Sequence, residues 1–280
     1  MMDDRREELS ASQRRHYLEH ALEFTDACRT AIGRVRAAGV DVRLKPDGSL
    51  VTNADLEAER AFRDAVGVHY PEAAIIGEEF GETNPGAVLE WVIDPIDGTT
   101  EFAKNIPLYS TIIALRYKGL PVVGVIDQPA LNIRCYGSYG LGAFQDGEPL
   151  RIDDLTPDWI RGAERIALPS RATFLRHGEA GHVFDAVARA HPNFRIFHTG
   201  YAHVCALTEA VDAALEWRVQ SWDVAATQLL VEEAGGLYRD VEEREEPGFG
   251  RVYSAVFGKP RLVKRLAELM SGISATEEPA

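Results

Sequence analysis

Near the start of the chain, from Ser12 to Ala38, apolar and small residues recur at helical spacing. Steps of three and four residues place such positions on one face of a helix. The pattern therefore predicts one long amphipathic helix that ends at Gly39. The positions that define its apolar face are Leu18, Ala21, Leu22, Phe24, Thr25, Cys28, Ile32 and Val35.

A second helical pattern extends roughly from Ala54 to His69. Thr52 or Asn53 precedes it, and either side chain can accept a hydrogen bond from the first free backbone N–H groups of a helix. Pro71 follows, and the residue before a proline disfavours helical backbone. The sequence predicts a helix between these limits.

Short β-rich runs come next, and the first two end in acidic residues. The later runs follow one another with short links, which favours an antiparallel sheet. Residues 145–148, Gln-Asp-Gly-Glu, are typical of a tight hairpin turn. The predicted strands are 73–79, 91–94, 108–117, 121–127 and 133–140.

After about Leu150 short strands alternate with helical patterns, which is typical of an α/β arrangement. We predict an N-terminal α+β half, residues 1–150, with a mainly antiparallel sheet, and a C-terminal α/β half, residues 151–280. The acidic run Glu242–Glu246 is expected to be a solvated loop, and residues 275–280 a frayed tail. The predicted C-terminal elements are strands 164–170, 193–198 and 211–216 and helices 177–190, from about 201, and 222–236.

The net charge of the chain argues against nucleic-acid binding as its function. The formal net charge is -14, whereas proteins that bind nucleic acids usually present a basic face. A protein of this charge that handles phosphate needs local positive charge, and a bound metal ion is the obvious source. We therefore expect no nucleic-acid partner.

Cysteine usage and the N-terminus favour a cytoplasmic protein. The three cysteines lie far apart and form no zinc-binding spacing. The charged N-terminus resembles no signal peptide. No apolar run approaches the roughly 20 residues of a membrane span, so we expect no membrane partner.

Acidic residues follow two predicted strands and open a later helix. Glu78 and Glu79 end one strand, Asp94 ends the strand Trp-Val-Ile-Asp, and Asp97 follows in a loop bent by proline. Asp223 lies at the start of a helix much later in the chain. Strand ends and helix starts meet at one edge of a layered α/β core, where ligands usually bind.

Each acid also has a simpler interpretation. Asp97 or Asp223 alone is typical of a helix cap, and the pair Glu78–Glu79 is typical of exposed loop charge. Asp94 directly follows an apolar run, and a buried carboxylate without a partner is unfavourable. Taken together, oxygen ligands without His or Cys favour Mg²⁺, with Mn²⁺ as the alternative.

The segment Asp-Gly-Thr-Thr, residues 97–100, adds a phosphate site. A helix that starts at Gly98 presents unpaired N–H groups, which bind phosphate readily. The Thr99 hydroxyl can orient a water molecule. Acids for metal beside amides for phosphate are what metal-assisted hydrolysis of a phosphate ester requires.

Three motifs in this order resemble the inositol monophosphatase family of metal-dependent, lithium-sensitive phosphatases. They are Gly-Glu-Glu at 77–79, Trp-Val-Ile-Asp-Pro-Ile-Asp-Gly-Thr-Thr-Glu-Phe at 91–102 and Trp-Asp-Val-Ala-Ala at 222–226. The resemblance implies a layered α-β-α-β-α sandwich and a homodimer. It implies a phosphomonoesterase in which metal-activated water attacks phosphorus directly.

The resemblance also implies a ligand set for two or three Mg²⁺ ions. Glu78, Asp94 and the carbonyl of Ile96 would hold the first ion. Asp94, Asp97 and Asp223 would hold the second, with Asp94 bridging the two. Glu78, with water molecules, would help to hold a third.

Further roles follow from the resemblance. Glu78 and Thr99 would orient the attacking water, and the amides of Gly98 and Thr99 would bind phosphate. Asp55 would support the third ion from behind its ligands. Lys45 either approaches the metal site or is simply exposed to solvent.

The substrate side stays open between alternatives. Glu216 matches the family position that contacts substrate hydroxyls, or is a surface acid at a strand end. Tyr201 and His203 either line the pocket or pack in the protein. Residues 124–129, Gly-Val-Ile-Asp-Gln-Pro, resemble the histidinol-phosphate branch, so inositol monophosphate and histidinol phosphate are the expected substrates. Adenosine 3′,5′-bisphosphate and fructose 1,6-bisphosphate are the alternatives within the family.

Two competing functions remain. Haloacid-dehalogenase-type phosphatases use Asp-x-Asp-Gly-Thr, in which the first aspartate forms an acyl phosphate, whereas this chain has Asp-x-x-Asp-Gly-Thr. Outside enzymes, the same acids would suit a metal-stabilised phosphate-binding regulatory module.

Overall fold

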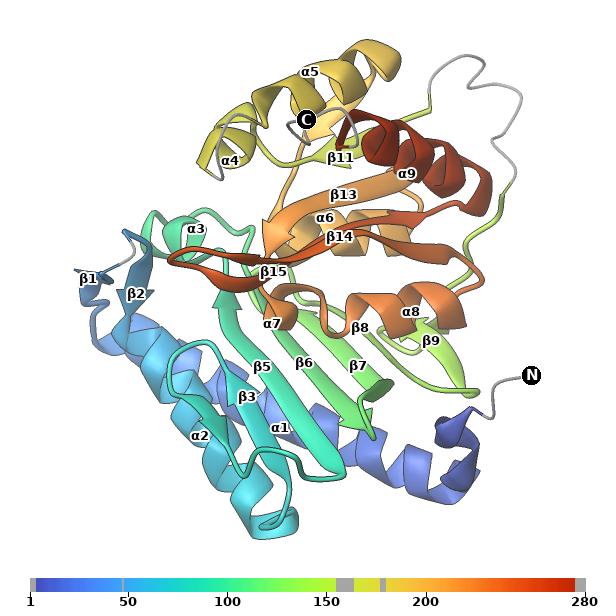
Figure 1. Ribbon diagram of the computed structural model, residues 1–280. Helices are drawn as coiled ribbons and strands as arrows, with labels where there is room; N and C mark the ends of the chain where they lie inside the picture. The colour runs from blue at the N-terminus through green and yellow to red at the C-terminus, as the bar shows by residue number, and fades with distance from the viewer. Residues whose placement is uncertain (1–3, 47, 155–163, 177–179, 275–280) are drawn as a thin grey trace.

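The computed structural model describes residues 4–46, 48–154, 164–176 and 180–274. Its first layer is a pair of helices, α1 (Ala11–Ala38) and α2 (Asn53–His69), which lie along one face of the largest sheet (Figure 1). Both helices match the prediction. Of the two residues proposed to cap α2, Thr52 does so, because its hydroxyl accepts a hydrogen bond from the N–H of Ala54.

The large sheet has eight strands and is antiparallel except where β3 and β5 pair in parallel. It confirms the antiparallel run predicted for the N-terminal half. A separate pair, β1 (Val42–Leu44) and β2 (Leu50–Thr52), precedes α2. In spatial order the strands are β10 (Glu148–Pro149), β9 (Gly142–Gln145), β8 (Ile133–Ser138), β7 (Leu120–Gln128), β6 (Ser110–Tyr117), β5 (Leu89–Asp97), β3 (Ala74–Gly77) and β4 (Gly81–Thr83).

The second sheet has five strands of mixed direction. Strand β11 pairs in parallel with β12 and β13, and β15 pairs antiparallel with β13 and β14. In spatial order they are β12 (Phe194–Ile196), β11 (Ile166–Leu168), β13 (Ala213–Val219), β15 (Gly250–Gly258) and β14 (Leu237–Glu246).

One sequence interpretation is wrong here. The acidic run Glu242–Glu246 is the end of strand β14 and not a solvated loop. Strand β14 is an edge strand, where charged side chains stay in water while the backbone pairs with one neighbour. Cross-strand ion pairs from Arg251 to Glu243 and Glu245 offset part of the acidic repulsion.

Short helices complete the layers. Three lie between the sheets: α6 (Thr199–Leu207), α7 (Ser221–Val224) and α8 (Thr227–Glu233). Three cover the far face of the small sheet: α4 (Arg171–Arg176), α5 (Gly181–Ala190) and α9 (Pro260–Ser274) (Figure 1). The predicted layered α-β-α-β-α sandwich is confirmed. Two small helices, η1 (Arg5–Glu8) and α3 (Thr99–Ala103), lie outside these layers.

Several element limits differ from the prediction. The helix expected over 177–190 begins at Gly181, and residues 177–179 lie outside the described residues, as does the predicted tail 275–280. The single helix expected over 222–236 is two, α7 and α8. Helices α4 and α9 and the hairpin of β14 and β15 were not predicted.

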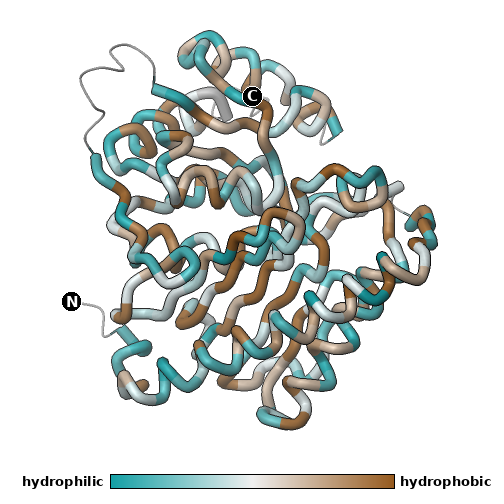
Figure 2. Tube along the Cα trace, turned by 180° about the vertical axis from the view of Figure 1, so that it is seen from behind, coloured by the Kyte–Doolittle hydropathy of each residue, from teal (hydrophilic) through white to brown (hydrophobic). Residues whose placement is uncertain are grey.

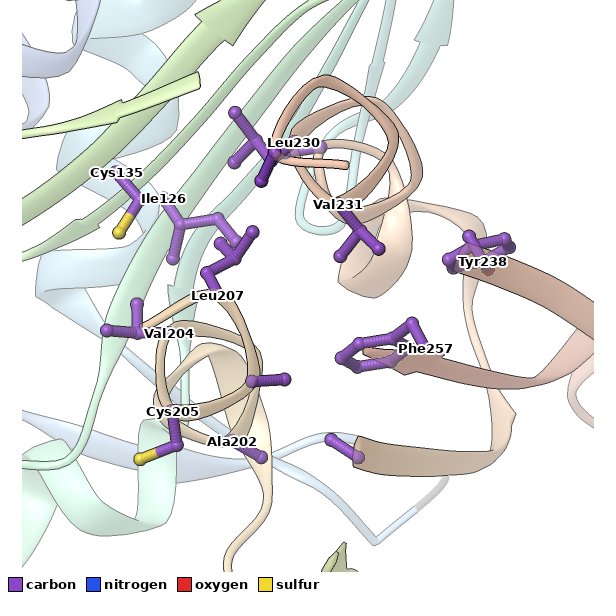
Figure 3. Packing of buried hydrophobic residues seen from close by; sticks show 14 of the residues in the cluster. Ile126, Cys135, Ala202, Val204, Cys205, Leu207, Leu230, Val231, Tyr238 and Phe257 are labelled. Carbon is purple, nitrogen blue, oxygen red and sulfur yellow. The ribbon is translucent and has the colours of Figure 1, made fainter. Parts of the chain in front are cut away.

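Apolar side chains from both sheets meet around the middle helices. Ile126 and Cys135 from the large sheet, Leu207 from α6 and Leu230 from α8 face Phe257 of the small sheet (Figure 3). Seen from behind, hydrophobic stretches follow the strands of the large sheet (Figure 2). All three cysteines are buried and free. Among the described residues no helix has the length and apolar character that crossing a membrane requires.

Candidate active site

Two neighbouring parallel strands bring the first acids together. Strand β3 ends at Gly77, directly before Glu78, and its parallel neighbour β5 carries Asp94 and Asp97 at the same edge. Parallel strands place their carboxyl ends side by side, which is where ligands bind in sheets of this kind. The predicted gathering of these acids at one edge is thus a direct result of the β3–β5 pairing.

A bulge in β5 lets two acids that are three residues apart face the same way. Along a regular strand, such residues point to opposite faces. Here Asp94 pairs with Ile112 and Asp97 with Ser110, so one extra residue is inserted in β5. The strand therefore continues to Asp97, whereas the sequence analysis ended it at Asp94 and placed Asp97 in a loop.

Helix α7 adds the third aspartate, Asp223. Ligand oxygens of Asp94, Asp97 and Asp223 all lie within 4.8 Å of one another. Asp223 also caps its helix, because its Oδ2 accepts the N–H of Gln220 at 2.7 Å. The capping interpretation and the ligand interpretation of Asp223 are therefore compatible, since a carboxylate has two oxygens.

Asp97 accepts a hydrogen bond from a helix N-terminus, but the helix is α6 and not α3, which follows Asp97 in the sequence. It accepts the N–H of Gly200 at the start of α6, while Gly98 and not Asp97 precedes α3. Gly200 lets the start of α6 lie close to β6, because a Cβ there would lie 2.5 Å from Ser110 Oγ. Thr199, with φ of 68°, holds the turn into α6 in the left-handed region.

The three aspartates have no cationic side chain among the groups that shift their pKa values. Burial, followed by the charges of Glu78 and Asp97, raises the pKa of Asp94 well above its ordinary value. Burial, then the charge of Asp223, does the same for the pKa of Asp97. Burial, then the charge of Glu78, raises the pKa of Asp223 to about 8. Their ionised forms thus need an added positive charge.

The Oδ1 atom of Asp94 indicates where an added cation would bind. Asp94 is 2% exposed, and its buried Oδ1 has no hydrogen-bond partner among the residues that the structure describes. A carboxylate oxygen left in this state is unfavourable by about 1–3 kcal/mol or more. Three converging carboxylates without nitrogen or sulfur ligands match the preferences of Mg²⁺ and Mn²⁺.

Lys45 reaches the next two acids. Its ammonium lies 2.8 Å from Glu78 Oε1 and 2.7 Å from Glu79 Oε1. Burial lowers the pKa of Lys45, but these two ion pairs raise it above its ordinary value. Burial raises the pKa of Glu79 to about 7. The simpler interpretation, in which Lys45 and the pair Glu78–Glu79 are exposed surface charges, is therefore wrong.

Glu59 shapes this loop and was missed in the sequence. It is fully buried, and its carboxylate accepts the N–H of Glu79 at 2.8 Å and of Phe80 at 3.1 Å. Gly77 makes room for it, since a Cβ there would lie 2.1 Å from Glu59 Oε1. The available signal was a glycine directly before the acids combined with an acid on the inner face of α2.

Asp55 and Thr99 face each other beside the aspartates. The Thr99 hydroxyl lies 3.2 Å from Asp55 Oδ1 and 3.1 Å from the carbonyl oxygen of Ile96. Asp55 also accepts the N–H and hydroxyl of Thr52. Burial raises the pKa of Asp55 to about 6, although the bonds from Thr52 oppose this.

Gly98 turns the chain from β5 into α3. Its φ of 94° lies in the left-handed region, and an added Cβ would lie 3.1 Å from the carbonyl oxygen of Leu108. Helix α3 starts at Thr99, one residue later than expected. Gly98 and Thr99 line a cavity of about 470 Å³ together with Glu78, Asp97 and Asp223.

The far wall of this cavity contains a buried polar chain. His203 Nε2 lies 3.1 Å from Glu216 Oε1, and His203 Nδ1 lies 2.7 Å from the hydroxyl of Thr227. His203 and Glu216 are 1% and 5% exposed, and both line the cavity. Thr227 was not anticipated from the sequence. Glu216 is therefore not the surface acid of the simpler interpretation.

Tyr201 is the one proposed pocket residue that the structure does not bring to the described cavity lining. Its ring packs against Phe197 at a centroid distance of 5.2 Å. On helix α6 it lies two residues from His203, and residues two apart do not share a helix face.

The sequence model of the inositol monophosphatase family matches residues 15–274 of this chain. The chain belongs to the inositol monophosphatase family. It is accordingly a phosphoric monoester hydrolase that acts on small phosphate monoesters.

Two histidinol-phosphatases and an inositol monophosphatase are similar to this chain. Histidinol-phosphatase of Mycobacterium tuberculosis is 35% identical over 213 residues, 72% of this chain and 79% of that protein. Histidinol-phosphatase of Chlorobaculum parvum is 31% identical over 229 residues, 81% of this chain and 87% of that protein. The structure of an inositol monophosphatase from Zymomonas mobilis superposes with a TM-score of 0.76 at 27% identity, covering 94% of this chain and 99% of that one.

Proposed function

We propose that this chain is a Mg²⁺-dependent phosphatase whose preferred substrate is histidinol phosphate. The observation that carries the metal dependence is the convergence of Asp94, Asp97 and Asp223, with a buried oxygen of Asp94 left without a partner. Glu78 and the carbonyl of Ile96 complete the proposed ligand set. When bound, Mg²⁺ supplies positive charge for the phosphoryl group and makes a coordinated water more acidic.

The chain's own groups position the reactants. Thr99 and Asp55 form a hydrogen-bonded pair, which orients the attacking water together with Glu78. The backbone N–H groups of Gly98 and Thr99 bind the phosphoryl oxygens at the entry to α3. This assignment implies direct attack by water, so no phosphorylated form of Asp94 should accumulate.

The charge of the cavity favours a substrate with a cationic organic part. Five acidic side chains line this cavity, and Arg176 is the only Lys or Arg in its described lining. Lys45 and Arg218 line the cavity that adjoins it. Histidinol phosphate carries an amino group and an imidazole, which suit Glu216 at the far wall and Glu101 on α3. The histidinol-phosphatases among the relatives support the same choice. A substrate with a second phosphate, such as fructose 1,6-bisphosphate, would meet more acidic than basic side chains in this cavity.

Phosphate release in Mg²⁺, compared among four substrates, tests the proposal. The substrates are histidinol phosphate, inositol 1-phosphate, fructose 1,6-bisphosphate and adenosine 3′,5′-bisphosphate. We expect the highest kcat/KM for histidinol phosphate and no turnover after chelation of the metal. Turnover that survives chelation would contradict the metal dependence. A folded, metal-loaded protein that hydrolyses none of the four would favour the regulatory binding module.

Two further family properties belong to the proposal. We expect Li⁺ to inhibit in the millimolar range, because it competes for a site that Mg²⁺ must occupy. We also expect a homodimer, which light scattering of the purified protein measures directly. Insensitivity to Li⁺ would narrow the subfamily without removing the role of the carboxylates.

A further inference from the structure

A second group of metal-ligating side chains lies at the opposite end of α2 from the carboxylates. Ligand atoms of His20 and Glu23 on α1 and of His69 on α2 all lie within 4.8 Å of one another. The ring centroids of His16 and His20 lie 4.1 Å apart with the rings tilted by 55°, and the ring centroids of His20 and His69 lie 4.2 Å apart. Imidazole and carboxylate ligands thus converge from two helices.

The antiparallel packing of α1 and α2 creates this convergence. His20 faces His69, Phe24 faces Phe62 further along, and the register brings the first half of α1 to the last turn of α2. On α1, His16 and His20 are four residues apart and Glu23 three further on, so all lie on one helix face. Neither helix alone offers this set.

Tyr70 fixes the central ring. Its hydroxyl lies 2.6 Å from Nδ1 of His20, which leaves Nε2 as the nitrogen available for a metal. An imidazole held through one nitrogen while the other binds metal is the usual arrangement around metal-ligating histidines. Burial, then the charges of His16 and His69, lowers the pKa of His20, which favours the neutral imidazole that metal binding needs.

We propose that His20, Glu23 and His69, with His16 beside them, form a second metal site that takes a divalent transition-metal ion. Two or three imidazoles with one carboxylate suit Zn²⁺, Cu²⁺ or Ni²⁺ and discriminate against Mg²⁺, in contrast to the carboxylate centre. His69 and Glu23 are exposed, so an ion has access from solvent. The bound ion would join α1 to the end of α2.

The site is remote from the catalytic centre. Helix α2 extends from Asn53, next to Asp55, to His69, which at 1.5 Å per residue is roughly 24 Å. The proposal therefore does not depend on the proposed phosphatase mechanism. Its ion is expected to act on stability, because a ligand that binds only the folded state raises Tm with its concentration.

Cu²⁺ titration followed by electron paramagnetic resonance tests the site, since nitrogen ligands split the copper signal and carboxylate oxygens do not. The full-length variant D94N/D223N is used so that the carboxylate centre contributes little. We expect one equivalent of copper with nitrogen coupling. In the same background H20Q/H69Q should lose that signal, whereas H182Q, which changes an exposed histidine on α5, should keep it.

A graded variant and a thermal measurement complete the test. Y70F should weaken copper binding by roughly 10-fold, because it removes only the group that orients His20. Zn²⁺ added in the presence of Mg²⁺ should raise the Tm of the wild type and of H182Q but not of H69Q, a substitution at an exposed position. Nitrogen coupling that persists in H20Q/H69Q, or an equal Tm rise in H69Q, would overturn the proposal. Unchanged phosphatase activity of H69Q is expected from the distance.

Discussion

Two buried aspartates on neighbouring regions of the large sheet have opposite surroundings. Asp127 on β7 is fully buried, and its carboxylate binds Arg29 of α1 at 2.7 Å and Arg134 of β8 at 2.8 Å. Asp94 on β5 is equally buried, yet Glu78 and Asp97 are among the nearest charges. One carboxylate has its cations built into the fold, and the other does not.

This difference distinguishes a structural acid from a ligand. Burial of an unpaired charge is strongly unfavourable, so a fold that needs the acid only for stability supplies a partner. A fold that leaves it unpaired relies on a partner from solution. Glu216 is intermediate, because its partner is the imidazole of His203.

The largest effect is expected for D94N. Phosphatase activity should fall by on the order of 10³-fold or more, since the shared ligand of the proposed ions is lost. The metal-free variant should be more stable than the wild type by about 1–3 kcal/mol, because one repelling charge has been removed. Steady-state kinetics and urea unfolding in a chelator measure the two. Near-normal turnover would remove Asp94 from the bridging role.

D127N should show the inverse behaviour. Removing this carboxylate leaves Arg29 and Arg134 without their buried partner, so the free energy of unfolding should fall by about 2–4 kcal/mol. Activity per folded molecule should change little, because Asp127 does not line the cavity. Urea unfolding gives the first quantity and active-site titration the second. A stability equal to wild type would show that the ion pairs contribute nothing.

Removing metal should make stability depend on pH. The pKa of Asp223 is about 8 in the fold against an ordinary value of 3.8, so the folded state binds the proton more tightly than the unfolded state. That stabilisation is complete below about pH 4 and is lost as pH rises towards 8, by up to about 1.4 kcal/mol per pH unit and proton.

The measurement is Tm between pH 5 and pH 8 in chelator and in Mg²⁺. In chelator Tm should fall as pH rises, and Mg²⁺ should restore it most at pH 8, because binding requires ionised carboxylates. D223N should flatten the slope in chelator. A wild-type slope of the opposite sign would contradict the assignment of raised pKa values to this cluster.

The smallest effect on activity is expected for His203, the partner of Glu216. H203F keeps a flat ring but removes the hydrogen bonds to Glu216 and Thr227, so KM should rise roughly 5- to 10-fold while kcat changes less. H203Q, which retains hydrogen-bonding groups, should recover part of the loss. An equal drop in kcat for both variants, with KM unchanged, would show that His203 does not position Glu216 for the substrate.

Much of the fold and of the candidate site was predictable from the sequence. The acids at strand ends and at a helix start predicted a metal site, and the family resemblance predicted its ligand set and the layered fold. Local patterns located α1, α2 and five of the eight strands of the large sheet, because each of these patterns is set by neighbours in the chain. Edge strand β14 was missed because its charged residues are typical of a loop.

Only the tertiary structure decided how these residues meet. The bulge in β5 turns Asp97 towards Asp94, Gly77 admits the carboxylate of Glu59, and α6 places His203 but not Tyr201 against the cavity. The pairing of Asp127 with arginines and the isolation of Asp94 were equally invisible, since both are an acid at the end of an apolar run. Contacts between segments far apart in the chain depend on register and packing, which leave no local pattern in the sequence.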